Sequence, residues 1–318
     1  MKYRPAALLR NGHFNTIYPV LFRVQNVPEY ERVRYETPDE DFFDVDFQKA
    51  GNKRIAIICH GLEGSSRSKY VIGTSTLLHQ NAWDVAAINH RSCSGEINRT
   101  QRMYHSGATW DLDFLIDMLL PHYEEISLVG FSLGGNMVLK YSGEQSNNLD
   151  EKIRSIVAVS VPMDLRAGSI QIGRRSNYIY EKKFLITLLK KMKIKARQFP
   201  ELIDEYSIPS CRSMYDFDER YTAPLHGFVN ADDYYAKSSS KFFVEFIQRP
   251  ALIINALDDP FLPEECYPES IVAQNPYCSL EIPKYGGHVG FVEWRQKYYW
   301  QEKRILAFLS EHSRLQAF

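Results

Sequence analysis

A chain of 318 residues can bury about three quarters of its unfolded surface, so it can form one large domain or two smaller ones. Apolar residues make up 44% and charged residues 24% of the sequence, an ordinary globular composition that excludes a largely disordered chain. The 38 basic and 39 acidic residues give a net charge of -1, so no overall field attracts nucleic acid or an anionic membrane, and we expect no nucleic-acid partner.

The N-terminal segment and the cysteines favour a soluble protein of a reducing compartment. In MKYRPAALLRNGHFNTIYPVLFR, arginines and prolines interrupt every apolar run, so we expect neither a signal peptide nor a membrane span there. The cysteines are odd in number and never spaced as a CxxC pair, which favours neither a disulfide framework nor a zinc site: Cys59, Cys93, Cys211, Cys266 and Cys278. We therefore expect a cytoplasmic protein.

Predicted strands follow one another along the chain. The first segment, ERVRYETPDEDFFDVDFQK (31–49), alternates and carries charge, which favours an antiparallel pair at a sheet edge. The buried runs that follow are RIAIICH from Arg54, WDVAAINH from Trp83, ISLVGFS from Ile126, SIVAVSVP from Ser155 and PALIINALDD from Pro250. Continuous apolar runs of this length, separated by helix-like segments, predict a mostly parallel sheet covered on both faces.

Helices are predicted between these strands and at the end of the chain. Residues 69–80, 109–123 and 133–144 place apolar side chains three and four positions apart, as a helix lying on a sheet requires. The segment 293–312 does the same. Together these segments predict an α/β fold.

The alternation of strands and helices breaks between about Met163 and Val229. NYIYEKKFLITLLKKMKIKARQF (177–199) predicts a long helix, and PSCRSMYDFDERYTAPLHGF (209–228) predicts aromatic-rich irregular chain. A helical insertion late in the sheet indicates a cap over one edge of the strands, here 163–229. No repeat or linker divides the chain, so we expect a single domain over 1–318.

The long helix of this cap combines apolar side chains with a high density of lysines, six of them between Lys182 and Lys195. That composition suits transient contact with a lipid surface. It equally suits a lid helix that packs on the sheet and has a solvated basic face, which is the interpretation we favour. Both interpretations place apolar side chains where an acyl chain could lie.

The stretch LVGFSLGG, Leu128 to Gly135, has the pattern G-x-S-x-G where a predicted strand ends and a predicted helix begins. The glycines permit a sharp turn that leaves the Ser132 hydroxyl above the sheet, as a catalytic nucleophile requires. The alternative is a glycine-rich helix start with an incidental serine. Cys93 is a weaker candidate nucleophile, because no histidine with an orienting acid is evident beside it.

A serine hydroxyl is a poor nucleophile by itself, so the chain must supply a base and an orienting acid. His288 follows an apolar run and the pair Gly286-Gly287, which places it on a loop at the end of a strand; a loop histidine without catalytic function is the alternative. Asp258 and Asp259 both end the predicted strand from Pro250. The residues alone leave the choice between them open.

The developing oxyanion of an acyl-transfer reaction needs hydrogen-bond donors. The backbone N-H of Leu133, directly after Ser132, is one candidate. The second is the N-H of Leu62 in the turn His60-Gly61-Leu62-Glu63-Gly64, an H-G-x-x-G pattern after the strand from Arg54. An ordinary turn with two glycines is the alternative interpretation.

Taken together, GFSLGGN, CHGLEGSS, INALDDPF and GGHVGF resemble the YheT-like branch of the α/β hydrolases, which also contains mammalian ABHD proteins and yeast medium-chain ester synthases. HRSCSGEINRTQRMYHSGATWDL (90–112) and NGHFNTIYPVLFR (11–23) are similar to further segments of that family, so the likeness covers nearly the whole chain. Ser92 departs from the family, which has glycine there. The order Ser132, Asp259, His288 is the α/β-hydrolase order, and in similar sequences the residue before the proline, here Asp259, is the triad acid.

The resemblance implies an α/β-hydrolase fold with a helical cap and a serine hydrolase that cleaves carboxylic esters of short- to medium-chain or lipid-like acyl groups. It implies no metal, no organic cofactor and no stable protein partner. Two alternatives remain: an acyltransferase that passes the acyl group to an alcohol, and a non-catalytic binding protein on a hydrolase fold.

Overall fold

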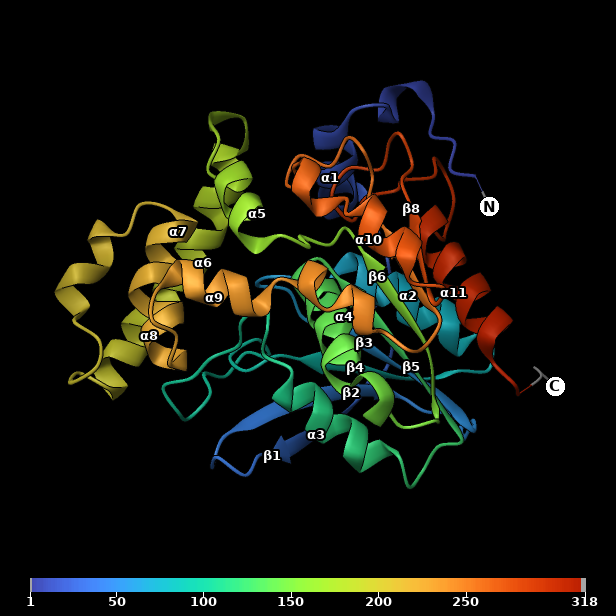
Figure 1. Ribbon diagram of the computed structural model, residues 1–318, viewed down its shortest axis with the longest axis horizontal. Coiled ribbons are helices and arrows are strands. Elements are labelled where there is room, and N and C mark those ends of the chain that lie inside the picture. Colours follow the sequence, from blue (N-terminus) through green and yellow to red (C-terminus); the bar gives the residue numbers. More distant parts are fainter. Residues whose placement is uncertain (1, 316–318) are drawn as a thin grey trace.

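The computed structural model describes residues 2–315, and its centre is an eight-stranded sheet with strand order β1-β2-β4-β3-β5-β6-β7-β8 (Figure 1). The strands are β1 (Glu31–Glu36), β2 (Phe42–Gln48), β3 (Arg54–Cys59), β4 (Asp84–Asn89), β5 (Glu125–Phe131), β6 (Ile153–Val159), β7 (Ala251–Ile254) and β8 (Cys278–Glu281). β2 pairs antiparallel with β1 and with β4, and the remaining neighbours are parallel. The predicted mostly parallel sheet with an antiparallel edge pair is confirmed.

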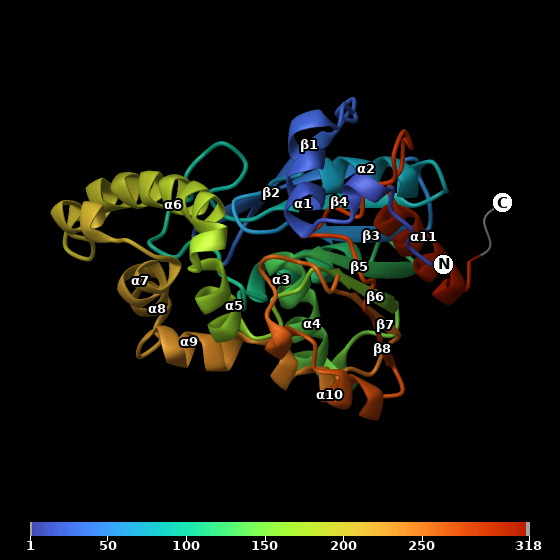
Figure 2. The same cartoon turned by 90° about the horizontal axis from the view of Figure 1, so that it is seen from above.

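Helices cover both faces of this sheet, with α2 and α11 on one face and α3, α4 and α10 on the other (Figure 2). The helices are α1 (Gly12–Phe22), α2 (Lys69–His79), α3 (Trp110–Leu119), α4 (Leu133–Gln145), α5 (Leu165–Ile172), α6 (Tyr178–Gln198), α7 (Met214–Phe217), α8 (Ala223–His226), α9 (Ala231–Ser238), α10 (Glu269–Gln274) and α11 (Trp300–His312). Within residues 2–315, none of them combines the length and hydropathy that crossing a lipid bilayer requires.

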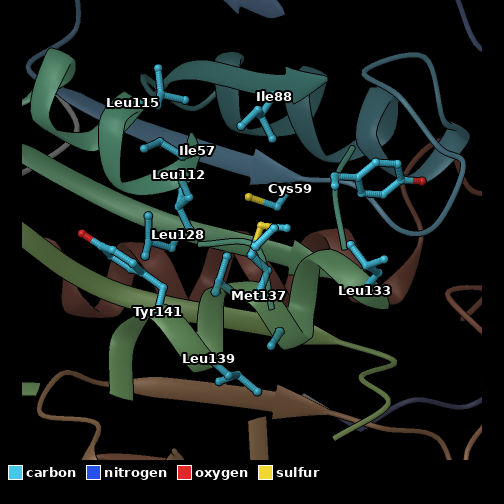
Figure 3. Close-up of a cluster of buried hydrophobic side chains, with 14 of the residues drawn as sticks. Ile57, Cys59, Ile88, Leu112, Leu115, Leu128, Leu133, Met137, Leu139 and Tyr141 are labelled. Atoms are coloured by element: carbon cyan, nitrogen blue, oxygen red, sulfur yellow. The ribbon is translucent and has the colours of Figure 1, made fainter. Parts of the chain in front are cut away.

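Strand β3 shows why the central strands are continuous apolar runs in the sequence. Ile55, Ile57 and Cys59 point to the face covered by α3 and α4, and Figure 3 shows Ile57 and Cys59 beside Leu112 of α3 and Met137 of α4. Ala56 and Ile58 point to the opposite face, where α2 and α11 pack. Since successive side chains alternate between two buried faces, every position of the strand must be apolar.

Between β6 and β7 the chain leaves the sheet and forms helices α5 to α9. Figures 1 and 2 both show α6 to α9 gathered beside one end of the sheet instead of on either face. The predicted long helix is present as α6, and Leu185, Leu188 and Met192 on one of its sides are buried. Helix α9 continues this helical region past residue 229.

Three local predictions are wrong. Most of the segment 209–228, predicted to be irregular, is helical: α7, a π-helical turn (Asp218–Thr222) and α8 follow one another without a break. The last helix begins at Trp300, not at residue 293, because Tyr299 is its N-cap: the Tyr299 N-H donates to Glu302 Oε2 at 3.0 Å, and Arg23 binds the same carboxylate. The lysines of α6 do not all face solvent. Lys195 is fully buried and donates to backbone carbonyls of the loop before α3, and burial lowers its pKa to about 8.

Candidate active site

Ser132 occupies the single position between β5, which ends at Phe131, and α4, which begins at Leu133. Its φ of 53° and ψ of -117° lie in a region that non-glycine residues rarely adopt. The N-H of Ser132 donates to the carbonyl of Val159 at 2.8 Å, which fixes the turn against β6. The predicted strand, sharp turn and helix are therefore all present around the serine.

The glycines of the motif are required by close backbone contacts. A Cβ on Gly130 would lie 2.3 Å from the carbonyl oxygen of Gly134, and a Cβ on Gly134 would lie 2.3 Å from the carbonyl oxygen of Cys59. Both neighbours are backbone atoms of buried elements, which cannot move away cheaply. The turn can therefore form only with glycine at both positions.

Replacing Gly134 by alanine is accordingly expected to destabilise the fold by about 3 kcal/mol or more, at the upper end of the usual range for overpacking. Urea denaturation followed by circular dichroism measures the change. Gly173→Ala is the matched control, because a Cβ there meets nothing closer than 3.5 Å. Equal stability of Gly134→Ala and the wild type would contradict the proposed constraint.

His288 and Asp259 form a hydrogen-bonded chain with Ser132. His288 Nε2 lies 3.0 Å from Ser132 Oγ, and His288 Nδ1 lies 2.9 Å from Asp259 Oδ2. The Asp259 side chain is fully buried, and its other oxygen accepts the N-H of Phe261 at 2.9 Å. These contacts orient the carboxylate toward the imidazole.

Asp258, the other candidate acid, hydrogen-bonds to the histidine loop and not to the imidazole, whose Nδ1 is taken by Asp259. Its Oδ1 accepts the N-H of Gly287 at 2.8 Å, so it supports the loop that carries His288 without contacting the ring. Burial and the nearby charge of Asp259 raise the pKa of Asp258. The geometry therefore distinguishes two adjacent aspartates that the residues alone could not.

Sequence reasoning missed the contribution of α1 to this loop. The Thr16 hydroxyl accepts the N-H of His288 at 2.8 Å, and the Asn15 side chain accepts the N-H of Val292 at 3.1 Å. Gly287 has a φ of 57°, and a Cβ there would lie 2.3 Å from the carbonyl oxygen of Gly12. The only sequence signal was the likeness of residues 11–23 to the family, which says nothing about this contact.

The turn from Gly61 to Gly64 lies against the serine. A Cβ on Gly61 would lie 3.1 Å from Ser132 Cβ, and the N-H of Gly64 donates to the carbonyl of Gly61 at 3.0 Å. Leu133 is the first residue of α4, so its N-H has no acceptor within that helix. Among residues 2–315, the N-H of Leu62 donates to no other group.

A largely apolar pocket opens at the serine. Its empty volume of about 1030 Å³ includes space open to solvent. Its walls come from the sheet's loops and from the insertion, and include Leu62, Leu165, Phe184, Leu188, Tyr221 and Phe261. One wall is polar: Asp218 accepts hydrogen bonds from Thr222 and Tyr235, and burial raises its pKa to about 6.

Neither a metal centre nor a second nucleophile is suggested by the part of the chain that the structure describes. No three His, Cys, Asp or Glu side chains of residues 2–315 gather so that they could hold a metal ion. Burial raises the pKa of the Cys93 thiol to about 11, and its polar contacts are with Lys191 Nζ and Tyr104, not with a histidine. A thiol with such a raised pKa is a poor nucleophile at neutral pH.

The model of the alpha/beta hydrolase fold family matches residues 57–184, a range that includes Leu62, Ser132 and Leu133. YheT of Escherichia coli is 33% identical to this chain, over 98% of this chain and 94% of YheT. The chain belongs to the YheT-like family of α/β hydrolases. The predicted family, fold and esterase- or lipase-like enzyme class are therefore confirmed.

More distant relatives of this YheT-like hydrolase extend the comparison. The human phospholipase ABHD3 is 28% identical over 98% of this chain and 80% of its own length. A monoacylglycerol lipase of Saccharomyces cerevisiae is 28% identical over 87% of this chain and 63% of its own length. The solved structure of the Pyrococcus furiosus esterase Pf2001 superposes with a TM-score of 0.59 at 16% identity, covering 89% of this chain and 93% of that one, which shows the fold alone.

Proposed function

We propose that this YheT-like hydrolase cleaves carboxylic esters through an acyl-enzyme on Ser132, with His288 as general base and Asp259 as the orienting acid. The supporting observation is the continuous chain of contacts from Ser132 Oγ through His288 to Asp259, at 3.0 Å and 2.9 Å. A hydroxyl with a base in reach, and a base held by a buried carboxylate, is the arrangement that nucleophilic acyl transfer requires.

In the first half-reaction, Ser132 Oγ attacks the ester carbonyl while His288 Nε2 takes its proton. Asp259 accepts the Nδ1-H of His288, which selects the tautomer with a free Nε2 and stabilises the imidazolium. The protonated His288 then gives its proton to the leaving alcohol, and the acyl group stays on the serine. No step needs a metal or an organic cofactor.

The tetrahedral intermediate carries a negative charge, for which we propose the N-H groups of Leu62 and Leu133 as donors. Both are backbone donors beside Ser132, and neither is committed to a partner within its own element. Losing one such donor typically raises the barrier by about 2.7 to 4 kcal/mol. Water then attacks the acyl carbon while His288 removes its proton. The bond from the acyl carbon to Ser132 Oγ breaks, His288 returns the proton to Oγ, and the carboxylic acid is released.

The apolar pocket supports acyl chains of short to medium length or lipid-like groups as the substrate class. We propose that residues 163–229 act as a cap within the single domain, because α5 and α6 supply pocket walls. Transient contact of the cap with a lipid surface is also proposed, since Ile179 and Ile186 of α6 are exposed. The free cysteines of the described chain support a cytoplasmic location.

A series of p-nitrophenyl esters from acetate to dodecanoate tests the substrate class. Each methylene that enters the pocket removes apolar surface from water, so kcat/KM should rise about threefold to fourfold per methylene and then level off or fall once the pocket is full. A profile that does not depend on chain length would exclude this pocket as the acyl site. Product analysis with ethanol present separates hydrolysis from transfer to an alcohol.

A further inference from the structure

The turn that carries Leu62 is tied to the helical insertion by a partly buried ion pair. Lys191 Nζ, from α6, lies 2.6 Å from Glu63 Oε1, and the two side chains are only 16% and 7% exposed. Glu63 directly follows Leu62 in the chain. Glu63 therefore connects α6 to Leu62, the residue whose N-H is the proposed oxyanion donor.

Glu63 stands at a strained position of this turn. Its φ is 55°, and the hydrogen bond from Gly64 N-H to the Gly61 carbonyl makes Glu63 the third of four turn residues. A positive φ at that position is the pattern of a type II turn, in which glycine is preferred. The contacts of Glu63 must therefore offset the cost of its backbone conformation.

Those contacts come from two sides. The Tyr104 hydroxyl accepts the N-H of Glu63 at 2.7 Å and donates to its Oε1 at 2.9 Å, and Lys191 binds the same Oε1. Burial by itself lowers the pKa of Lys191. Cys93 and Glu63 raise this pKa by more than burial lowers it, so the ammonium stays charged. Without Lys191, a buried carboxylate would lack its cation.

The same helix lines the pocket, so the ion pair depends on where α6 lies. Phe184 and Leu188 of α6 face the pocket, and Lys195, one turn after Lys191, donates to the carbonyls of Asn98 and Thr100. Residues four apart share one side of a helix, which is why both lysines reach the core. Displacement of α6 would withdraw Lys191 from Glu63.

We propose that Lys191 and Glu63 are positioning residues. Their ion pair holds the Gly61–Gly64 turn in the shape that directs the Leu62 N-H at the oxyanion. The ion pair forms only while α6 covers the pocket. This inference rests on the proposed function. Its consequence is that an uncovered pocket retains the serine and histidine but lacks one ordered oxyanion donor. Catalysis is thereby coupled to closure over the substrate.

The test is Lys191→Met, measured with the best p-nitrophenyl ester. We expect kcat to fall about 10- to 100-fold, which is less than the loss of an oxyanion donor would cause, because the Leu62 N-H is displaced but still present. KM should change less than about twofold. Inhibition by an alkyl trifluoromethyl ketone, which forms an oxyanion on the serine, should weaken by a similar factor. Lys191→Arg should recover most of the activity, because it restores the charge.

Lys190→Met is the matched control, since the neighbouring Lys190 is exposed on the same helix. It should behave as the wild type, and an equal loss in both variants would overturn the proposal. A rise in KM at unchanged kcat would also overturn it, because that result means only weaker substrate binding. If Lys191→Met does not fold, Glu63→Gln gives the same comparison.

Double-variant measurements and the serine variant separate this inference from the proposed function. Lys191→Met and Glu63→Gln together should cost no more than either alone, because they remove one interaction. Activity that survives in Ser132→Ala would remove the proposed function itself. An inactive Ser132→Ala together with a fully active Lys191→Met would remove only the inference about the ion pair.

Discussion

Replacement of Ser132 by alanine should lower kcat for ester hydrolysis by a factor on the order of 10⁴ to 10⁶. The reason is that we propose this hydroxyl as the group that forms the acyl-enzyme, and among residues 2–315 no other hydroxyl or thiol hydrogen-bonds to the His288 ring. The rate with a p-nitrophenyl ester measures the loss. Labelling by a fluorophosphonate probe, which needs the activated serine, should disappear in the same variant.

The chain offers a matched control for this substitution. Ser146, at the other end of α4, has φ and ψ of 46° and -116°, nearly the values of Ser132. Ser146→Ala therefore makes the same chemical change in the same backbone conformation, away from the pocket. It should leave both activity and labelling as in the wild type. Labelling of Ser132→Ala at the wild-type level would remove the serine from the mechanism.

Asp259→Asn should lower kcat by a factor on the order of 10⁴, because an amide cannot stabilise the imidazolium and favours the wrong tautomer of His288. The fold should be retained, since the two side chains have nearly the same shape. KM should change little, because Asp259 lies behind the histidine and does not line the pocket. Steady-state kinetics of the purified variant measure both parameters.

Asp258→Asn is the direct comparison, since it makes the identical change one residue away. The carboxylate of Asp258 accepts the N-H of Gly287, and an asparagine carbonyl can keep that hydrogen bond. We expect less than about a tenfold loss of kcat. If Asp258→Asn is as inactive as Asp259→Asn, the assignment of a single orienting acid is wrong.

The fold was largely predictable because its signals are local. Apolar runs without alternation indicated strands buried on both faces, and the structure has them in β3, β4, β5, β6 and β7. The start of α11 was not predictable from apolar spacing, because Glu302 is held by Arg23, which lies 279 residues away in the chain. A helix boundary set by such a contact leaves no periodic signal.

The sequence by itself determined the serine turn and the short set of candidate partners. A strand, two obligatory glycines and a helix within eight residues leave few backbone conformations, so spacing alone predicts where Ser132 lies. Tertiary structure alone decided which aspartate meets His288, since Asp258 and Asp259 are chemically identical and differ only in the direction that the loop gives them. It also decided that Thr16 holds the histidine loop and that Lys191 reaches Glu63, contacts spanning 272 and 128 residues. Contacts of that range arise only when distant elements pack together, and no local pattern records them.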